Sequence, residues 1–381
     1  MTEQSDYASP AARAAPRRFQ VEFTGTGGEY FRIWIVNLLL TIVTLGIYSA
    51  WAKVRKMQYF YRNTRVDGAI FDYHGRPGAI LKGRIIVLVL AMAYNLSFRF
   101  SLTAGIVVAL ALAVAMPWLL AQSQRFRLHN SSYRGLRFRF LGTVGEAYMI
   151  YGLPLLVVLA VGVAMAQMGL QAQRGVEPGF AFIASMLIGY GVLLLLWPYL
   201  HYRFKRYQHA NSAFGNTQST FAGKVSRFYI YYAIALAALV GVAVLVFGSI
   251  SMLGPKRGYG SVFLFGAGLV LFYVVLLAIG PYISARVQNH VWKTTRIGAV
   301  GFESAVKARK LVWIVMSNLV LIVFTLGLFT PFAAVRSMRY RLQAVAVLSG
   351  DDLANFVSAS ASEVAAIGEG AADLFDVDFA L

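Results

Sequence analysis

The chain has no cysteine among its 381 residues, so disulfide bonds and thiolate metal sites are excluded. Charged residues are also scarce, because they make up 13% of the chain, about half of their share in soluble domains. Acidic residues are the rarest, with 16 Asp and Glu against 35 Lys and Arg, and none lies between Glu177 and Glu303. Carboxylates inside apolar spans usually mark proton or ion coupling, so their absence argues against a proton-coupled pump of the common kind.

The sequence also lacks the short motifs that identify many enzymes and cofactor-binding proteins. It contains no phosphate-binding loop, no G-x-S-x-G, no kinase signature and no H-E-x-x-H. A metal site needs three or four converging ligands, and the histidines form no close pair, so hydrogen bonding near lipid headgroups is their simpler role. We therefore expect a non-enzymatic protein with no catalytic residues, no cofactor and no metal. The five histidines are His74, His129, His201, His209 and His290.

Hydrophobic residues are abundant, at 58% of the chain, and they predict an integral membrane protein. Six apolar runs approach the roughly 20 residues that a helix needs to cross a bilayer. They form three pairs, which we interpret as transmembrane helical hairpins: 84–98 with 101–121, 147–168 with 180–200, and 229–253 with 261–285. Lys and Arg gather in the segments outside these pairs, at 52–84, 122–146, 201–228 and 286–310. The positive-inside rule places these basic segments in the cytoplasm.

Residues 37–59 and 318–340 are near-copies of each other. Each copy has an apolar run, a Thr-Leu-Gly break, aromatic residues and a basic end. Six predicted crossings separate the copies, so a second copy that crosses once would put its basic end outside the cytoplasm, and the simplest way to keep both basic ends inside is that neither copy crosses the bilayer. The copies are then re-entrant, with a turn at Thr-Leu-Gly. The alternative is eight ordinary spans with some basic residues on the unexpected side.

The basic segments contain a second repeat. Asp67-Gly68, between alternating residues, predicts a two-residue β-hairpin turn, and 129–138, 210–215 and 293–298 resemble this region. We therefore predict an all-α polytopic membrane protein with three transmembrane hairpins, two re-entrant or spanning repeat segments, and small cytoplasmic β-ribbons. The predicted domain boundaries are a disordered tail at 1–18, a membrane domain at 19–345 and an acidic tail at 346–381.

Several motifs resemble the YjgN-like family of multi-pass bacterial inner-membrane proteins, whose function is unknown. They are Phe23-Thr24-Gly25, Glu29-Tyr30-Phe31, Thr44-Leu45-Gly46-Ile47-Tyr48, Trp51-Ala52 and the ribbon Asn63-Thr64…Gly68…Phe71. The resemblance covers roughly 19–356. It implies location in the bacterial inner membrane and a multi-pass topology, and it supplies no catalytic residue.

Two sets of residues are candidates for binding. Polar residues and turn glycines of the two copies would line a central cavity, although Asn inside apolar runs also serves as a hydrogen bond between helices. This cavity set is Asn37, Thr44, Gly46, Asn318, Thr325 and Gly327. Basic residues beside aromatic ones would contact anionic lipid headgroups, although solvated charge that sets topology is the simpler role for any one of them. This headgroup set is Arg55, Arg125, Arg127, Arg203, Lys205, Arg206 and Arg336.

We predict that the protein binds or transports a small solute or lipid without catalysing a reaction. The alternative is a membrane scaffold or assembly factor whose basic ribbons dock lipid or an unidentified protein. The acidic tail could then cover the basic face as a lid. Nucleic acid is disfavoured as a partner, because the basic residues lie in short segments that adjoin apolar runs.

Overall fold

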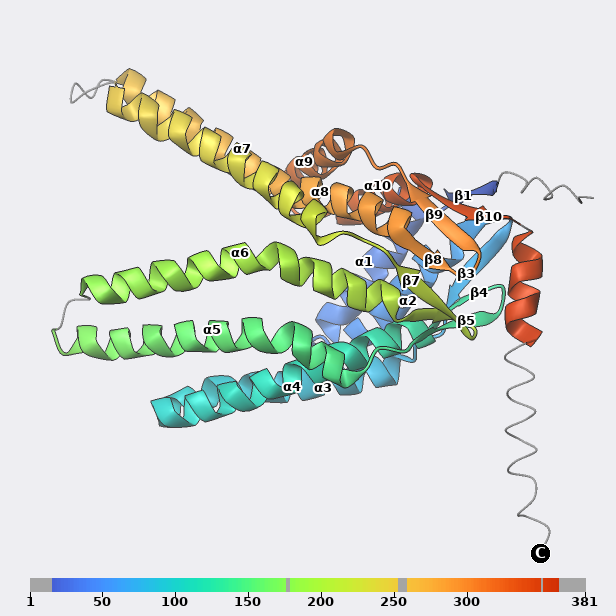
Figure 1. The fold of residues 1–381 in the computed structure, drawn as a ribbon, viewed down its shortest axis with the longest axis horizontal. Coiled ribbons are helices and arrows are strands. Elements are labelled where there is room, and N and C mark those ends of the chain that lie inside the picture. The colour runs from blue at the N-terminus through green and yellow to red at the C-terminus, as the bar shows by residue number, and fades with distance from the viewer. Residues whose placement is uncertain (1–15, 176–178, 253–258, 351, 363–381) are drawn as a thin grey trace, which may run out of the picture.

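The computed structural model describes residues 16–175, 179–252, 259–350 and 352–362. Long helical hairpins extend to one side of the molecule, and short strands gather at the other side (Figure 1). The first and the last strand are hydrogen-bonded neighbours, so the two ends of the described fold meet in the strand region.

The strands form one closed antiparallel barrel, in which each strand pairs with the next along the chain and the last pairs with the first. The prediction of an all-α fold with small separate β-ribbons is therefore wrong. Isolated two-stranded ribbons are marginally stable, and closure gives every strand edge a partner. The ten strands are Arg17–Phe23 (β1), Thr64–Val66 (β2), Ala69–Tyr73 (β3), Ser131–Tyr133 (β4), Leu136–Phe140 (β5), Ser212–Phe214 (β6), Thr217–Phe221 (β7), Thr295–Ile297 (β8), Val300–Ser304 (β9) and Val345–Ser349 (β10).

Two-residue turns join the strands at the end of the barrel farthest from the helices. Asp67 and Gly68 have φ angles of 48° and 70°, and Arg134 and Gly135 have φ angles of 49° and 83°. Positive φ at both central residues defines the hairpin turn whose twist matches that of the strands. The turn predicted at Asp67-Gly68 is thus present, and its counterpart follows β4.

Five structural units follow one another along the chain, and each consists of a strand, a helical hairpin and a second strand that pairs with the first. Beyond the first strand, a backbone N–H donates to the carbonyl that precedes the second strand, as from Thr24 to Asn63 (3.0 Å) and from His74 to Asn130 (2.8 Å). The helices are Gly27–Val43 (α1), Ser49–Arg62 (α2), Pro77–Phe100 (α3), Leu102–His129 (α4), Val144–Gln173 (α5), Phe180–Ala210 (α6), Val225–Met252 (α7), Tyr259–Thr294 (α8), Ala308–Phe324 (α9) and Thr330–Gln343 (α10).

The second helix of each unit carries a common sequence pattern. Aligned on the carbonyl that accepts this hydrogen bond, four units place proline at one position and the first unit places alanine there. The following residue is aromatic in all five. The aligned pairs are Ala50-Trp51, Pro117-Trp118, Pro198-Tyr199, Pro281-Tyr282 and Pro331-Phe332. The repetition seen in two segments of the sequence therefore extends to five units.

The entry to each of the first four helical hairpins requires glycine two residues after an aromatic side chain. A Cβ atom added at Gly25 would lie 2.8 Å from the Phe23 ring, and Gly75, Gly142 and Gly223 would be as crowded by Tyr73, Phe140 and Phe221. The aromatic ring thus folds back over the point where the chain leaves the barrel, which explains the spacing in Phe23-Thr24-Gly25.

Helices α3 to α8 are the six described helices that are long and apolar enough to cross a membrane. In the most apolar 18-residue stretch of each of these helices, only between 0% and 22% is buried inside the protein. Helices this apolar and this exposed need hydrocarbon as their solvent. The chain is therefore a membrane protein, and the helical hairpins are its membrane part.

The two sequence copies correspond to the hairpins α1–α2 and α9–α10. Each reverses at its Thr-Leu-Gly break, where Gly46 and Gly327 both have φ of 92°, and returns to the barrel. The leucines at the tips, Leu45 and Leu326, are each 94% exposed. The reversal places the basic ends of both copies on the same side of the molecule. Exposed apolar tips on 17-residue helices fit re-entrant hairpins that enter the bilayer without crossing it.

The barrel interior is filled by apolar side chains. Tyr133 and Phe214 pack with Phe71 and Phe138 across its axis. A helix at 353–362 closes the turn end, where Phe356 stacks on Phe214 with ring centroids 6.0 Å apart. Residues 346–349 belong to β10, so the barrel extends past residue 345, and the acidic residues beyond 362 lie outside the described residues.

Candidate anion-binding site

One face of each second helix points into the space between the helices just above the barrel. It comprises the residues about one, two and three turns after the aligned proline or alanine. The first turn contributes Lys53, Leu120, His201, Ser284 and Ala334, and the second contributes Met57, Gln124, Lys205, Gln288 and Met338. The third contributes Phe60, Arg127, Gln208, Val291 and Arg341. Members of all three sets line the two cavities found there.

The α6–α10 cavity has a volume of about 430 Å³ and lies among α6, α7, α8 and α10. Its polar lining comes from Lys205 and His201 on α6, Ser284 and Gln288 on α8, and Arg341 on α10. Among the described residues that line it, none is acidic. This cavity is therefore polar, positively charged and placed where the membrane helices meet the barrel.

Three cations from three different units lie in this region, and we call Arg127, Lys205 and Arg341 the junction cations. The charges of Arg127 and Arg341 both act on the Lys205 ammonium. Burial also lowers the pKa of the Arg341 guanidinium from its ordinary value. Lys205 and Arg341 are both partly buried at the cavity, and like charges held together in such a place are costly unless an anion compensates them.

The hydrogen-bond partners of the junction cations are neutral. Lys205 donates to the Gln208 side-chain oxygen (3.2 Å), Arg127 donates to that of Gln124 (2.8 Å), and Arg341 donates to the Ser284 hydroxyl (2.5 Å). The three ion pairs among the described residues all involve other residues. They are Arg18 with Glu303, Arg62 with Asp72 and Arg134 with Asp67. The junction cations thus keep a charge that no described carboxylate neutralises.

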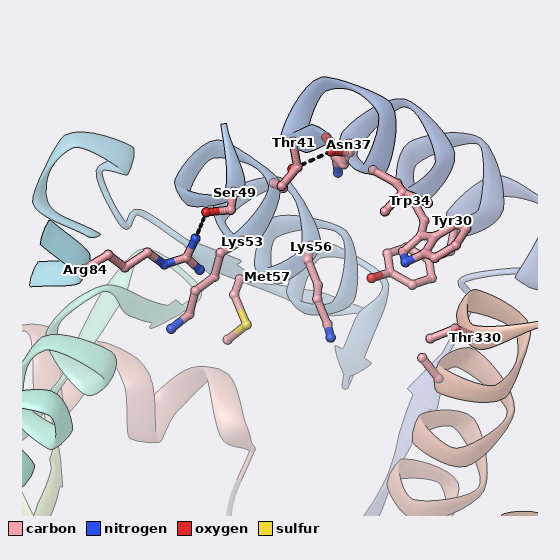
Figure 2. Close-up of a pocket in the computed structure, with 13 residues that line it drawn as sticks. Tyr30, Trp34, Asn37, Thr41, Ser49, Lys53, Lys56, Met57, Arg84 and Thr330 are labelled. Atoms are coloured by element: carbon pink, nitrogen blue, oxygen red, sulfur yellow. Dashed lines mark hydrogen bonds between the residues drawn. The ribbon is translucent and has the colours of Figure 1, made fainter. Parts of the chain in front are cut away.

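The α1–α2 cavity has a volume of about 480 Å³ and lies between the first repeat copy, α3 and α10. Lys53 and Lys56 extend into it from α2, and Arg84 reaches from α3 to donate to the Ser49 hydroxyl (Figure 2). Trp34 and Asn37 line it from α1. The described lining of this second cavity also has three cations and no carboxylate.

Sequence comparison identifies the family. A model described as "Bacterial protein of unknown function (DUF898)" matches residues 18–374. The chain belongs to this family. It is 24% identical to the "Inner membrane protein YjgN" of Salmonella typhimurium over 329 residues, which cover 81% of this chain and 83% of that protein. It is 32% identical to the "Inner membrane protein YjgN" of Escherichia coli K12 over 142 residues, 37% and 36% of the two chains. No solved structure matches.

In this DUF898 protein the predicted cavity residues separate into two groups. Asn37 lines the α1–α2 cavity, whereas Asn318 is buried between α9 and α10. The other four make the tips of the hairpins: Thr44 donates to the Leu40 carbonyl and accepts from the Tyr48 N–H, and Thr325 makes the same contacts in the second copy. Gly46 and Gly327 supply the positive φ angles of the two turns.

The predicted headgroup residues also differ in their surroundings. Arg127 and Lys205 are junction cations, and Arg206 lines a shallow cavity beside Glu146. Arg55 and Arg203 lie over the rings of Tyr48 and Tyr199, each at 5.8 Å from the centroid. Arg125 donates to the Gly142 carbonyl (3.0 Å), and Arg336 donates to Asn318 (3.1 Å).

Four basic residues of the two cavities were missing from the predicted sets, namely Lys53, Lys56, Arg84 and Arg341. Two of them could have been identified by aligning the sequence on the prolines of the second helices. Extending the alignment from Pro117, Pro198 and Pro281 to Pro331 and Ala50 puts Arg341 and Lys53 on the same helix face as Lys205. Arg84 lies on the first helix of its hairpin, so this alignment does not reach it.

The two histidines of the α6–α10 cavity pack against aromatic side chains. His201 shares a hydrogen bond with the Tyr232 hydroxyl (2.9 Å), and His209 packs edge to face on Trp292. Within the described ranges, no three His, Asp or Glu side chains converge in a way that could hold a metal ion.

Proposed function

We propose that this protein is a non-enzymatic protein of the bacterial inner membrane that binds an anionic lipid where its membrane helices meet the barrel. The names of the YjgN relatives support the inner membrane as its location. The density of Lys and Arg at the barrel end of the helices supports a cytoplasmic barrel, by the positive-inside rule.

The single observation that carries the proposal is the group of junction cations. Lys205 on α6 and Arg341 on α10 line one cavity, the charge of Arg127 on α4 acts on Lys205, and all three have neutral hydrogen-bond partners. Each cation near a membrane surface adds about 1 kcal/mol of attraction for anionic lipid. A phosphate in the cavity would compensate these charges and accept hydrogen bonds from Lys205 and Arg341.

A lipid is supported over a solute that passes along the axis of the barrel. Aromatic side chains fill the barrel, and the helix at 353–362 covers its turn end. The hairpins α3–α4, α5–α6 and α7–α8 splay apart away from the barrel (Figure 1). A ligand that is itself a membrane component can reach the junction sideways from the bilayer, between these hairpins.

The alternative of a docking scaffold has less support, because ion pairs neutralise some of the basic residues at the barrel. Arg18 pairs with Glu303 across β1 and β9, and Arg62 pairs with Asp72 near β3. These pairs reduce the positive charge that an outer docking face would need.

The test is a lipid titration of the delipidated full-length protein in detergent, followed by thermal unfolding. We expect phosphatidylglycerol to raise the unfolding temperature and phosphatidylcholine to have little effect. The double substitution Lys205→Gln with Arg341→Gln should remove the greater part of this shift. Arg296→Gln, on an exposed barrel residue, is the matched control and should keep the full shift.

Equal stabilisation by both lipids would refute the proposal, as would an undiminished shift in the double variant. If the double variant does not fold, Arg127→Gln provides a milder test, because Arg127 is exposed and donates to Gln124 alone among the described contacts.

A further inference from the structure

Asn37 has a buried acceptor without a donor. Its side chain is 6% exposed and lines the α1–α2 cavity, and the side-chain oxygen has no hydrogen-bond partner among the described residues. Buried polar atoms are almost always paired, and an orphan atom in a native protein calls for an explanation. A ligand that donates a hydrogen bond to Asn37 would supply one.

The second repeat copy shows how the same position is satisfied from within the protein. Asn318 is 4% exposed, and its oxygen accepts a hydrogen bond from Arg336 (3.1 Å). Its nitrogen donates to the Ser337 hydroxyl (3.1 Å) and to the Ala333 carbonyl (3.3 Å). This site is therefore closed by side chains of α10.

In the first copy the corresponding side chains are differently placed. Arg55 is the counterpart of Arg336, but it lies over the Tyr48 ring and leaves Asn37 without a donor. Lys56 replaces Ser337 and extends into the cavity (Figure 2). The two copies share a backbone, and the first leaves a buried, unpaired acceptor next to a cavity of about 480 Å³.

The chemistry of the cavity restricts the ligand. Lys53, Lys56 and Arg84 require an anionic group, and Asn37 requires a donor close to it. An ammonium donor would be repelled by the three cations, so a neutral donor such as a hydroxyl fits the cavity. Trp34 and Leu38 complete the lining with apolar surface that suits the start of an acyl chain.

We propose that the α1–α2 cavity binds the headgroup of a phospholipid that carries a hydroxyl group beside its phosphate, such as a glycerol headgroup. This goes beyond the proposed function, because the α1–α2 cavity is a second site apart from the junction cations, although it rests on the same anionic lipid binding and adds a specificity. The phosphate lies among Lys53, Lys56 and Arg84, and the hydroxyl donates to Asn37 in the place that Arg336 takes at Asn318 in the second copy.

The experiment compares two lipids of equal charge. Phosphatidylglycerol and phosphatidylmethanol are titrated separately into the delipidated full-length protein, and the bound lipid is measured by native mass spectrometry. Wild type should bind phosphatidylglycerol about three- to tenfold more tightly, the range that one hydrogen bond supports. Asn37→Leu should bind both lipids equally while retaining its preference for either over phosphatidylcholine.

Two further arms keep the test decisive. The double variant Lys53→Gln with Lys56→Gln should bind both anionic lipids more weakly and leave the ratio of their two affinities unchanged. This arm can be read even if the Asn37→Leu variant does not fold. Soluble glycerol phosphate at millimolar concentration should fail to displace phosphatidylglycerol. Displacement at matched concentrations would overturn the lipid assignment.

The outcomes also separate the two proposals. If wild type binds phosphatidylglycerol and phosphatidylmethanol equally, and both more tightly than phosphatidylcholine, the specificity is refuted and anionic lipid binding stands. If neither anionic lipid binds more tightly than phosphatidylcholine, both proposals are refuted.

Discussion

The two repeat copies are similar in sequence and form the same hairpin. The buried asparagine has hydrogen-bond partners for both side-chain atoms in one copy and an unpaired oxygen in the other. In α9–α10, Arg336 and Ser337 satisfy Asn318 within the protein. In α1–α2, Asn37 keeps an unpaired oxygen in a cavity lined by three cations. Duplication has thus preserved a backbone while a few side-chain placements separate a structural hydrogen-bond network from a candidate binding site. The predictions below test this difference.

The largest effect is expected from leucine substitution of the two asparagines. Asn318→Leu removes the partners of Arg336 and Ser337, so it should destabilise the protein by about 2 kcal/mol. Asn37→Leu removes an oxygen that is already unpaired, so it should change stability by less than about 0.5 kcal/mol or increase it. Thermal unfolding of both variants in lipid-free detergent measures the contrast, and equal losses would contradict it.

A smaller contrast is expected between the two matched arginines. Arg336→Leu leaves Asn318 and Ser317 without a donor, which should cost about 1 to 2 kcal/mol. Arg55→Leu loses an exposed contact with the Tyr48 ring, which should cost about 0.5 kcal/mol. Chemical unfolding in mixed micelles compares the two variants. A larger loss for Arg55→Leu would show that the copies do not differ as described.

The hairpin tips should respond alike, because their geometry is the same. Gly46 and Gly327 both have φ of 92°, and neither has a neighbouring atom that would obstruct a Cβ. Gly46→Ala and Gly327→Ala should each cost about 1 kcal/mol through backbone strain alone. Unequal losses in the unfolding temperature would mean that one tip carries a further constraint.

The smallest effect concerns the ion pair between Arg62 and Asp72, which follows the first copy. Among the described residues, no matching ion pair follows the second copy. Burial raises the pKa of Asp72, but hydrogen bonds from Arg62 and the Tyr73 N–H, with the Arg62 charge, outweigh it and hold the pKa below 3.8. Gln343 takes the place of Arg62 after the second copy. A carboxyl group whose pKa is lowered on folding stabilises the fold at pH values above its ordinary pKa. This stability is lost as the pH falls through the pKa of the folded state.

Because both side chains are partly exposed, the contribution should be about 0.5 kcal/mol or less. Arg62→Gln should therefore be slightly less stable than wild type at about pH 6, and the gap should close toward about pH 3. Thermal unfolding across this range tests it, and a gap that widens in acid would contradict the assignment.

Much of the membrane part could be predicted from the sequence, whereas the barrel could not. The apolar runs and their basic flanks identified the three hairpins, and Asp67-Gly68 identified one hairpin turn. Six of the strands have seven or five residues, but β2, β4, β6 and β8 have three each, too few for an alternating pattern to be recognised. Closure depends on β1 pairing with β10 across almost the whole chain, which no local signal reveals.

The site was predicted in part for a similar reason. The sequence named Arg127 and Lys205 as candidates because they lie in basic segments beside aromatic residues, and it named Asn37 because it is polar in an apolar run. Arg341 and Lys53 belong to the site through the alignment of the second helices, which becomes visible only when the strands fix the register. The difference between Asn37 and Asn318 depends on side-chain placement, so comparing the sequences of the two copies could not reveal it.

The central claim is that the junction cations hold an anionic lipid, and lipid carried through purification tests it most directly. Full-length wild type and the Lys205→Gln, Arg341→Gln double variant would be extracted from the same membranes in mild detergent, and their bound lipids identified by mass spectrometry. Wild type should retain anionic phospholipid in excess of its share of the membrane, and the double variant should retain less. Bound lipid in membrane proportions, or equal retention by the two proteins, would contradict the account.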